Sequence, residues 1–241
     1  MKVSETLLNA PATIEILDEC KPQDVDEVLE FFHSHSLLFN IYRKDSEISK
    51  INRGVLRPND VVPVVRKVLK ACDETRVATN GYFDCKIERM INPAGLLKGY
   101  LISEAASTLR NKGYQNFYIE IGGDMEVCGS KNGKKWKIGI ANPSSRMKPY
   151  AIHLLDKGLA TSISNGHGIP IYNPVTHKVA NAIKSVTVIA DTCFDADRFS
   201  TALLAMGEKA VAFLEQHEEL AALIVFRDGK EYFTPSIDTY M

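Results

Sequence analysis

The stretch FYIEIGGDMEV, residues 117–127, marks the point at which the hydrophobic pattern of this 241-residue chain changes. Apolar residues occupy positions 117, 119 and 121, and the alternation resumes at Met125 and Val127 after Gly122-Gly123-Asp124. A period of two residues predicts β-strands, and two glycines followed by Asp are ordinary chemistry for a tight turn. We therefore predict two strands joined by a hairpin turn, in a sheet that is half buried.

The same alternation recurs on both sides of this stretch. It predicts strands over residues 11–17, 136–140, 152–154 and 186–188, and a closing hairpin of residues 222–226 and 231–233. Two helices, residues 193–206 and 208–216, are expected to interrupt the later strands.

Before residue 114 the apolar residues recur every three or four positions, which predicts four helices. The expected N-caps are Asp24 for the first helix, Asp45 or Ser46 for the second and Asp60 for the third. The fourth is expected over residues 96–111. No repeated strand–helix–strand unit and no GxGxxG motif occurs, so we predict a single α+β domain, residues 1–241. Its first half is helix-rich and its second half strand-rich, around a mixed or antiparallel sheet, with an internal subdivision near residue 114.

The composition is that of a soluble globular protein, with 45% hydrophobic residues, 24% charged residues and a formal net charge of −1. No basic stripe predicts nucleic acid as a partner. No apolar run reaches the ~18–20 residues of a membrane span, and the start of the chain lacks a signal-peptide pattern, so we expect a cytoplasmic protein. The five cysteines lack zinc spacing and are expected to be reduced thiols. The oligomeric state stays open, a homodimer included.

Lys98 lies in the first turn of the fourth predicted helix, within the segment NPAGLLKGY at residues 92–100. A cation is mildly unfavourable at this end of a helix unless an anion also binds there. A phosphate would accept hydrogen bonds from the free amides and from the ammonium group. The alternative is a lysine that points into water. Residues 122–124 are equally ambiguous, because paired glycines suit either a close ligand or a simple turn.

Asp197 and Thr201 lie four residues apart on the predicted helix 193–206, so their oxygens share one face. Thr192 and Asp195 resemble a capping box at its start. Carboxylate and hydroxyl oxygens are ligands that Mg²⁺ prefers, usually together with substrate phosphates. The alternative is a polar helix surface. These residues suggest phosphate and magnesium, and no residue order predicts a hydrolytic triad.

Seven segments in this order resemble the ApbE family, the FAD:protein FMN transferases. They are residues 42–52, 79–84, 92–100, 121–124, 136–143, 160–162 and 196–203. The resemblance implies binding of FAD and Mg²⁺, cleavage of the pyrophosphate, and attachment of FMN to a Thr or Ser hydroxyl of an acceptor protein.

The resemblance also implies roles for individual residues. Asp197 and Thr201 would be metal ligands, together with a backbone carbonyl of Leu96 or Leu97. The residues expected to contact the nucleotide are Lys98, Gly99, Gly122, Gly123, Asp124, Thr161 and Ser162, and Tyr42 would lie against a flavin or adenine ring.

The chain departs from the family where the acceptor hydroxyl should be activated. Pro170 stands where the family has a His, Asn173 replaces an Asp, and His177 replaces a Gly. Proline cannot accept a proton, so His167 and His177 are the candidate catalytic bases, the alternative being that both are ordinary loop histidines. Glu120 and Ile163 also replace family residues, an Asn and a Gly.

Three functions remain open from the sequence. The first is transfer of FMN from FAD to a protein hydroxyl with release of AMP, and the family resemblance favours it. The second is binding of FAD without catalysis. The third is Mg²⁺-dependent cleavage of FAD by water to FMN and AMP, because the expected metal ligands are retained while the family's base is not.

Overall fold

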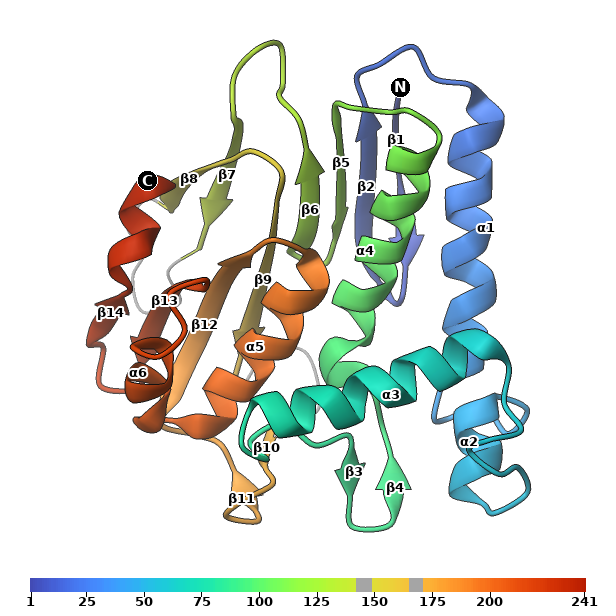
Figure 1. Ribbon diagram of the computed structural model, residues 1–241, viewed down its shortest axis with the longest axis vertical. Coiled ribbons are helices and arrows are strands. Elements are labelled where there is room, and N and C mark those ends of the chain that lie inside the picture. Colours follow the sequence, from blue (N-terminus) through green and yellow to red (C-terminus); the bar gives the residue numbers. More distant parts are fainter. Residues whose placement is uncertain (142–148, 165–170) are drawn as a thin grey trace.

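An eight-stranded sheet runs through the centre of the computed structural model, which describes residues 1–141, 149–164 and 171–241 (Figure 1). Its strand order is β1-β2-β5-β6-β9-β12-β13-β14, and each neighbouring pair is antiparallel. The strands of this sheet are β1 (Lys2–Leu7), β2 (Ala10–Ile16), β5 (Phe117–Ile121), β6 (Asp124–Cys128), β9 (Lys157–Ile163), β12 (Ile183–Ala190), β13 (Ala221–Phe226) and β14 (Glu231–Phe233). Hairpins outside it are formed by β3 (Lys86–Ile87) with β4 (Met90–Ile91), β7 (Trp136–Ile140) with β8 (Tyr150–Leu154), and β10 (Tyr172–Asn173) with β11 (Lys178–Val179).

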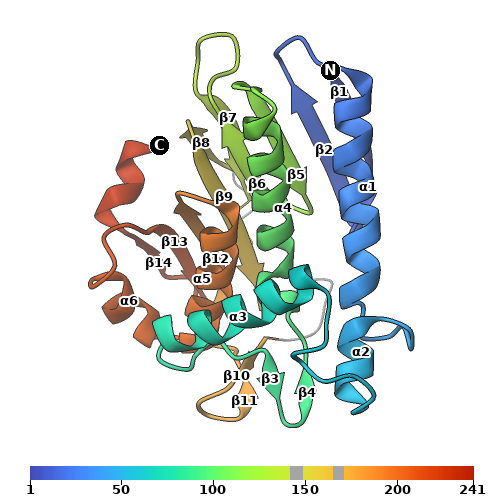
Figure 2. The ribbon, with the colours of Figure 1, turned by 45° about the vertical axis from the view of Figure 1, so that its right-hand side comes forward.

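Helices cover one face of the sheet, and α3 lies across the lower ends of α4 and α5 (Figures 1 and 2). The helices are α1 (Pro22–Phe39), α2 (Glu47–Asn52), α3 (Pro63–Ala78), α4 (Ala94–Asn111), α5 (Cys193–Met206), α6 (Lys209–Leu214) and the 3₁₀ helix η1 (Pro235–Thr239). Phe32 of α1 and Leu101 of α4 pack on Ile14 and Ile119 of the sheet, while Val68 of α3 belongs to the core beneath α5. The start of α4 therefore lies where α3, α5 and the sheet meet.

The opposite face of the sheet is covered by the β7–β8 hairpin and η1. Trp136, Ile152 and Ile237 pack there against Met125 and Leu223. All five residues of β6 are buried as a result. The expectation of a half-buried sheet holds for β2 and β5, in which buried residues alternate with partly exposed ones. It is wrong for β6 and β12, because the β7–β8 hairpin and η1 shield the face that would otherwise meet water.

The predicted fold class is confirmed: an α+β fold with a helix-rich first half and a strand-rich second half around an antiparallel sheet. Two strands of the sheet, β1 and β9, are not among those predicted. The fourth helix begins at Ala94, two residues before the expected start.

Two expected N-caps are wrong. Lys21 precedes α1 and Val62 precedes α3, and neither helix has a side-chain cap. Both helices begin with a proline, whose fixed φ and missing N–H suit the first helical position. Ser46 does cap α2, accepting a hydrogen bond from the Ser49 amide.

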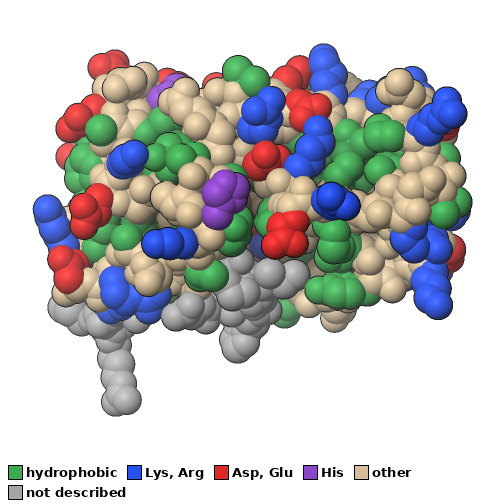
Figure 3. Space-filling model, turned by 90° about the horizontal axis from the view of Figure 1, so that it is seen from below, with side chains coloured by type: hydrophobic (Ala, Val, Ile, Leu, Met, Phe, Trp, Pro, Cys, Tyr) green, Lys and Arg blue, Asp and Glu red, His purple; other side chains and the backbone are tan. Residues whose placement is uncertain are grey.

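The lower end of the molecule carries α2 and the β3–β4 and β10–β11 hairpins (Figure 1). Lys, Arg, Asp and Glu side chains are interspersed on this end, among hydrophobic ones (Figure 3). Within the described ranges, no helix has both the length and the hydrophobicity needed to cross a membrane.

Asp18, after β2, holds the turn that follows α4, and its removal is expected to destabilise the fold. Its carboxylate accepts hydrogen bonds from the amides of Gln115 (2.7 Å) and Asn116 (2.8 Å) and from the Asn116 side chain (3.0 Å). Burial alone would raise the pKa of Asp18, but the Asn116 side chain and these amides outweigh it and hold that pKa below its ordinary value.

A lowered folded-state pKa means that this contribution is present above the ordinary Asp pKa and lost as the pH falls through the folded-state value. We expect Asp18→Asn to lower the free energy of unfolding at pH 7 by about 1 kcal/mol. The difference should be smaller at a pH below the ordinary Asp pKa of about 3.9, where the carboxyl group begins to take up a proton. Urea unfolding at both pH values measures it, with exposed Asp60→Asn as the control, and a difference independent of pH would contradict it.

Candidate functional site

Helices α4 and α5 pack closely in opposite directions, and two glycines of α4 lie at their contact. The Gly99 amide donates to Asp197 Oδ2 at 2.8 Å, and the Thr201 hydroxyl donates to the Gly95 carbonyl at 2.9 Å. A Cβ atom at Gly99 would lie 2.5 Å from both Asp197 Cβ and the Cys193 carbonyl oxygen. The absence of a side chain at Gly99 therefore brings the Asp197 carboxylate to the first turns of α4.

Lys98 points toward the sheet, so the alternative that it points into water is wrong. Its ammonium lies 2.8 Å from Asp124 Oδ2, and the other oxygen of Asp124 accepts from the Thr161 amide at 3.0 Å. The side chain of Asp124 is 3% exposed and that of Lys98 is 30% exposed. Gly122 and Gly123 form the predicted turn between β5 and β6, and a Cβ at Gly122 would lie 3.6 Å from the Lys98 ammonium. The three predicted segments thus converge on one place.

Charge in this cluster is unbalanced, because two buried carboxylates share one lysine. Burial raises the pKa of Asp197 well above its ordinary value, the neighbouring Asp124 raises it further, and Lys98 opposes both. Burial also raises the pKa of Asp124, against the opposing charge of Lys98. Burial alone would lower the pKa of Lys98, but Asp124 outweighs it and that pKa is raised. A cation beside Asp197 would relieve this imbalance.

Hydroxyl groups extend the cluster toward β9. Ser162 Oγ lies 2.9 Å from Ser200 Oγ and 3.3 Å from Thr201 Oγ1, and Thr161 Oγ1 lies 2.9 Å from Thr187 Oγ1. Ser162 therefore contacts the predicted metal ligand Thr201 directly, while Thr161 approaches the cluster through its backbone amide.

The donor set fits Mg²⁺. It combines the Asp197 carboxylate with the Thr201 hydroxyl and a backbone carbonyl, all hard oxygen atoms. The described residues contain no cluster of three or more His, Cys, Asp and Glu side chains that could hold a metal ion, so an ion here would depend on a single carboxylate with a hydroxyl and a backbone carbonyl. The carbonyl at the Thr201 hydroxyl is that of Gly95, and the expected ligand carbonyl of Leu97 stays a prediction.

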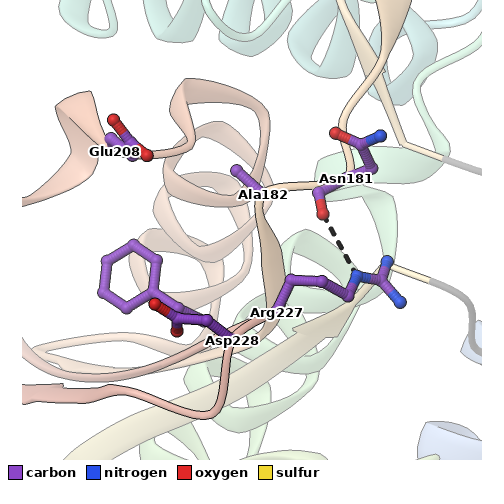
Figure 4. Close-up of a pocket in the computed structure, with 6 residues that line it drawn as sticks. Asn181, Ala182, Glu208, Arg227 and Asp228 are labelled. Carbon is purple, nitrogen blue, oxygen red and sulfur yellow. Dashed lines mark hydrogen bonds between the residues drawn. The ribbon is translucent and has the colours of Figure 1, made fainter.

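Tyr42 lies apart from this cluster in the chain and borders a cavity of about 240 Å³ with Met90 and Asn52. The residue is 80% exposed. An exposed aromatic face beside a hollow is suited to stacking. The ring contact expected of Tyr42 stays a prediction. A second pocket of about 810 Å³ lies between Glu208, Arg227 and Asn181, and none of the predicted site residues within the described ranges lines it (Figure 4).

His177 lies on the exposed turn between β10 and β11, in the left-handed region at φ 56°. Asn173 holds this hairpin against α5, because its amide group donates to the Ala205 carbonyl at 2.6 Å while its oxygen accepts from the amides of residues 175 and 176. An Asp could not supply that donor, which accounts for Asn173. His167 and Pro170 lie outside the described residues. A catalytic role for either histidine stays a prediction.

The sequence-based prediction lacks three residues: Gly95 and Ser200 of the cluster, and Glu126, which accepts from the Cys193 amide at the start of α5. A signal for Glu126 exists. The two-residue turn at Gly122-Gly123 pairs Ile119 with Glu126, which places this carboxylate on the face that carries the buried isoleucines of β5. A buried charge is unfavourable without a partner, so a charged residue on a core face predicts a buried ion pair or hydrogen bond.

Two relatives show how far the sequence likeness extends. The FAD:protein FMN transferase of Vibrio cholerae is 26% identical over 205 residues, which cover 76% of this chain and 60% of that one. The FAD:protein FMN transferase of Haemophilus influenzae is 28% identical over 166 residues, covering 62% and 47%. The chain thus spans about half to three-fifths of the length of these curated relatives.

Solved structures share the fold. The flavin transferase ApbE from Vibrio cholerae superposes with a TM-score of 0.84 at 21% identity, over 100% of this chain and 99% of that one. The ApbE protein from Thermotoga maritima superposes with a TM-score of 0.85 at 20% identity, over 100% and 98%. A sequence profile of the ApbE family matches residues 8–96 and 90–224. Because that match extends over most of the sequence, this chain belongs to the ApbE family.

Proposed function

We propose that this protein uses Mg²⁺ to cleave FAD and transfers FMN to a Thr or Ser hydroxyl of an acceptor protein, with release of AMP. The observation that carries the proposal is the buried contact of Asp197 and Thr201 with the first turns of α4, next to the Lys98–Asp124 pair. Relatives named FAD:protein FMN transferase support it.

Each part of the cluster has a role in this proposal. Asp197 and Thr201 hold the ion, with the backbone carbonyl of Gly95 or Leu97. Mg²⁺ bound there would supply positive charge that stabilises the leaving phosphate of AMP. Lys98 pairs with phosphate oxygens, which also neutralises charge that develops on them. The remaining residues proposed to contact the nucleotide are Gly99, Gly122, Gly123, Asp124, Thr161, Ser162 and Tyr42.

AMP release separates this function from its alternatives. The protein is incubated with FAD and Mg²⁺, with and without a peptide that carries a candidate acceptor Thr or Ser. Release that requires the peptide, with FMN attached to it, supports transfer. Release without the peptide supports hydrolysis, and bound FAD that stays intact in both supports a binding protein. EDTA should suppress release in either catalytic case.

Hydrolysis is the second candidate, and a specific observation favours it. The only candidate base among the described residues, His177, lies on an exposed turn, and Pro170 occupies the position of the family's His. Without a base to activate the acceptor hydroxyl, water is the remaining nucleophile.

The transfer proposal makes His177 the group that accepts the proton of the acceptor hydroxyl. A positioned general base contributes about 10²–10⁴-fold, so His177→Ala should lower peptide-dependent AMP release by at least ~100-fold. Mg²⁺ binding should not change, because His177 lies outside the Asp197 cluster. His33→Ala, an exposed histidine of α1, is the control. Full transfer activity in His177→Ala would remove His177 as the base and leave His167 to be tested.

A further inference from the structure

The first three free amides of α5 are all capped, and two of the caps come from other elements. Thr192 Oγ1 accepts from the Asp195 amide at 3.0 Å, which is the local cap. Glu126 Oε2 of β6 accepts from the Cys193 amide at 2.9 Å. Ser103 Oγ of α4 accepts from the Phe194 amide at 2.9 Å. The start of α5 is thus attached to β6 and to α4.

Glu126 joins these caps into one network. Its side chain is fully buried, and the oxygen that accepts from Cys193 also accepts from the Ser103 hydroxyl at 2.5 Å. Its second oxygen lies 2.8 Å from the Arg110 guanidinium as an ion pair. A carboxylate is favoured at the positive end of a helix, so the capping of α5 and the pairing with Arg110 both stabilise the charge of Glu126.

The same network lies in line with the candidate metal site. Contacts between α4 and α5 follow one another at single turns: Ser103 with Phe194, Gly99 with Asp197, and Gly95 with Thr201. The start of α5 is also confined by Gly158 of β9, where a Cβ would collide with the Cys193 amide nitrogen. A helix rises 1.5 Å per residue, so a small slide or rotation of α5 would take Asp197 away from Gly99.

We propose that Glu126 is a positioning residue of the metal site, which fixes the start of α5 against α4 so that Asp197 and Thr201 meet the first turns of α4. This inference rests on the proposed function, since it concerns the metal site named there. Glu126 does not touch the metal ion or the substrate. It acts through the Cys193 amide and the Ser103 hydroxyl, which set the axial position of α5.

Binding of Mn²⁺ to the purified 241-residue chain tests the proposal without any turnover. Glu126→Leu fills the space and removes both accepted hydrogen bonds, whereas Glu126→Gln keeps an oxygen that can accept both. Loss of a group that orients a metal ligand costs about 10–100-fold in metal affinity, and we expect an increase of that size in the Mn²⁺ Kd of Glu126→Leu. Glu126→Gln should bind Mn²⁺ more tightly than Glu126→Leu, because its oxygen keeps both accepted hydrogen bonds although its NH2 group cannot pair with Arg110.

A structural control distinguishes positioning from simple loss of stability. Asp18→Asn removes the charge and the hydrogen bond from the Asn116 side chain at the other end of α4, and it should leave the Mn²⁺ Kd unchanged under conditions where all variants are folded. Ser103→Ala is the second variant if Glu126→Leu does not fold, and it should also weaken Mn²⁺ binding.

The outcomes separate this inference from the proposed function. A folded Glu126→Leu, or Ser103→Ala in its place, that binds Mn²⁺ as tightly as the wild type would overturn the positioning role while the metal site stands. Equal weakening by Asp18→Asn would overturn it as well. A wild-type chain that binds neither Mn²⁺ nor Mg²⁺ would overturn the proposed metal site, and the role of Glu126 with it.

Discussion

Asp197→Asn is expected to abolish the binding of Mg²⁺ and Mn²⁺ while leaving the fold intact. The amide oxygen of Asn can still accept from Gly99, so the contact between α4 and α5 is kept. The only negative charge of the proposed ligand set is lost. A unit charge at 4 Å is worth about 4 kcal/mol at an effective dielectric constant near 20, and a divalent ion at ligand distance interacts more strongly. We therefore expect affinity to fall by more than about 100-fold.

The thermal stability of this variant supplies an independent check. Burial raises the pKa of Asp197, which means that holding the carboxylate is unfavourable in the metal-free protein. In EDTA, Asp197→Asn should unfold at no lower temperature than the wild type. Saturating Mg²⁺ at ~100 times Kd should stabilise the wild type by about 2.7 kcal/mol and the variant not at all.

Asp195→Asn, two residues earlier on the same helix, is the matched control. Asp195 binds Thr192 and Arg198, so its replacement is expected to lower stability slightly and to leave metal binding unchanged. Wild-type affinity for Mg²⁺ in Asp197→Asn would contradict the metal assignment. Loss of metal binding in both variants would show a general effect of altering α5.

Elements with strong local signals could be predicted from the sequence. Residues 193–206 form α5 as predicted, because Thr192 and Asp195 cap its start and Gly207, at φ 63°, follows its end. Side-chain type alone could not show that α1 and α3 start without a side-chain cap. The Asp24 carboxylate instead accepts hydrogen bonds from Lys112 (2.7 Å) and from the Tyr114 hydroxyl (2.6 Å). These partners lie about 90 residues after Asp24 in the sequence.

Strand β9 shows why buried strands are harder to predict than amphipathic ones. It pairs with β6 and β12 in the middle of the sheet, and Gly158, Leu159 and Ala160 are buried in succession. Without alternation and with an internal glycine, its sequence lacks the strand signal of β5. Gly158 is there because the start of α5 leaves no room for a side chain.

The sequence indicated candidate residues of the site, but it did not indicate which of them contact one another. Lys98, Asp124 and Asp197 carry suitable chemistry, yet each was compatible with a surface or turn role in the sequence. The two pairings, Lys98 with Asp124 and Gly99 with Asp197, join segments that only the tertiary fold brings together. The same is true of Glu126, whose partners come from α4 and the start of α5.

Gly99→Ala is expected to be among the most destabilising single-methyl substitutions in this part of the chain. In the interior of a helix, alanine is favoured over glycine by about 1 kcal/mol, so propensity alone would stabilise the variant. The added Cβ would lie 2.5 Å from the Cys193 carbonyl oxygen and from Asp197 Cβ, and the carbonyl is backbone that cannot rotate away. Overpacking of this kind costs about 1–3 kcal/mol, occasionally more. We expect a net loss of about 2 kcal/mol in the free energy of unfolding, measured by urea denaturation.

A graded series of glycine variants makes this expectation specific. At Gly95 the new Cβ would lie 3.1 Å from the Phe83 ring and from Thr201 Cγ2, which are side-chain atoms, and at Gly139 it would lie 3.7 Å from Pro149. Stability should therefore fall in the order Gly139→Ala, Gly95→Ala, Gly99→Ala, and Mn²⁺ affinity should fall in step for the two α4 variants alone. If Gly99→Ala is as stable as Gly139→Ala, then α4 and α5 are not in the contact described. In that case the amide of residue 99 cannot hold Asp197, and the metal site loses the packing that defines it.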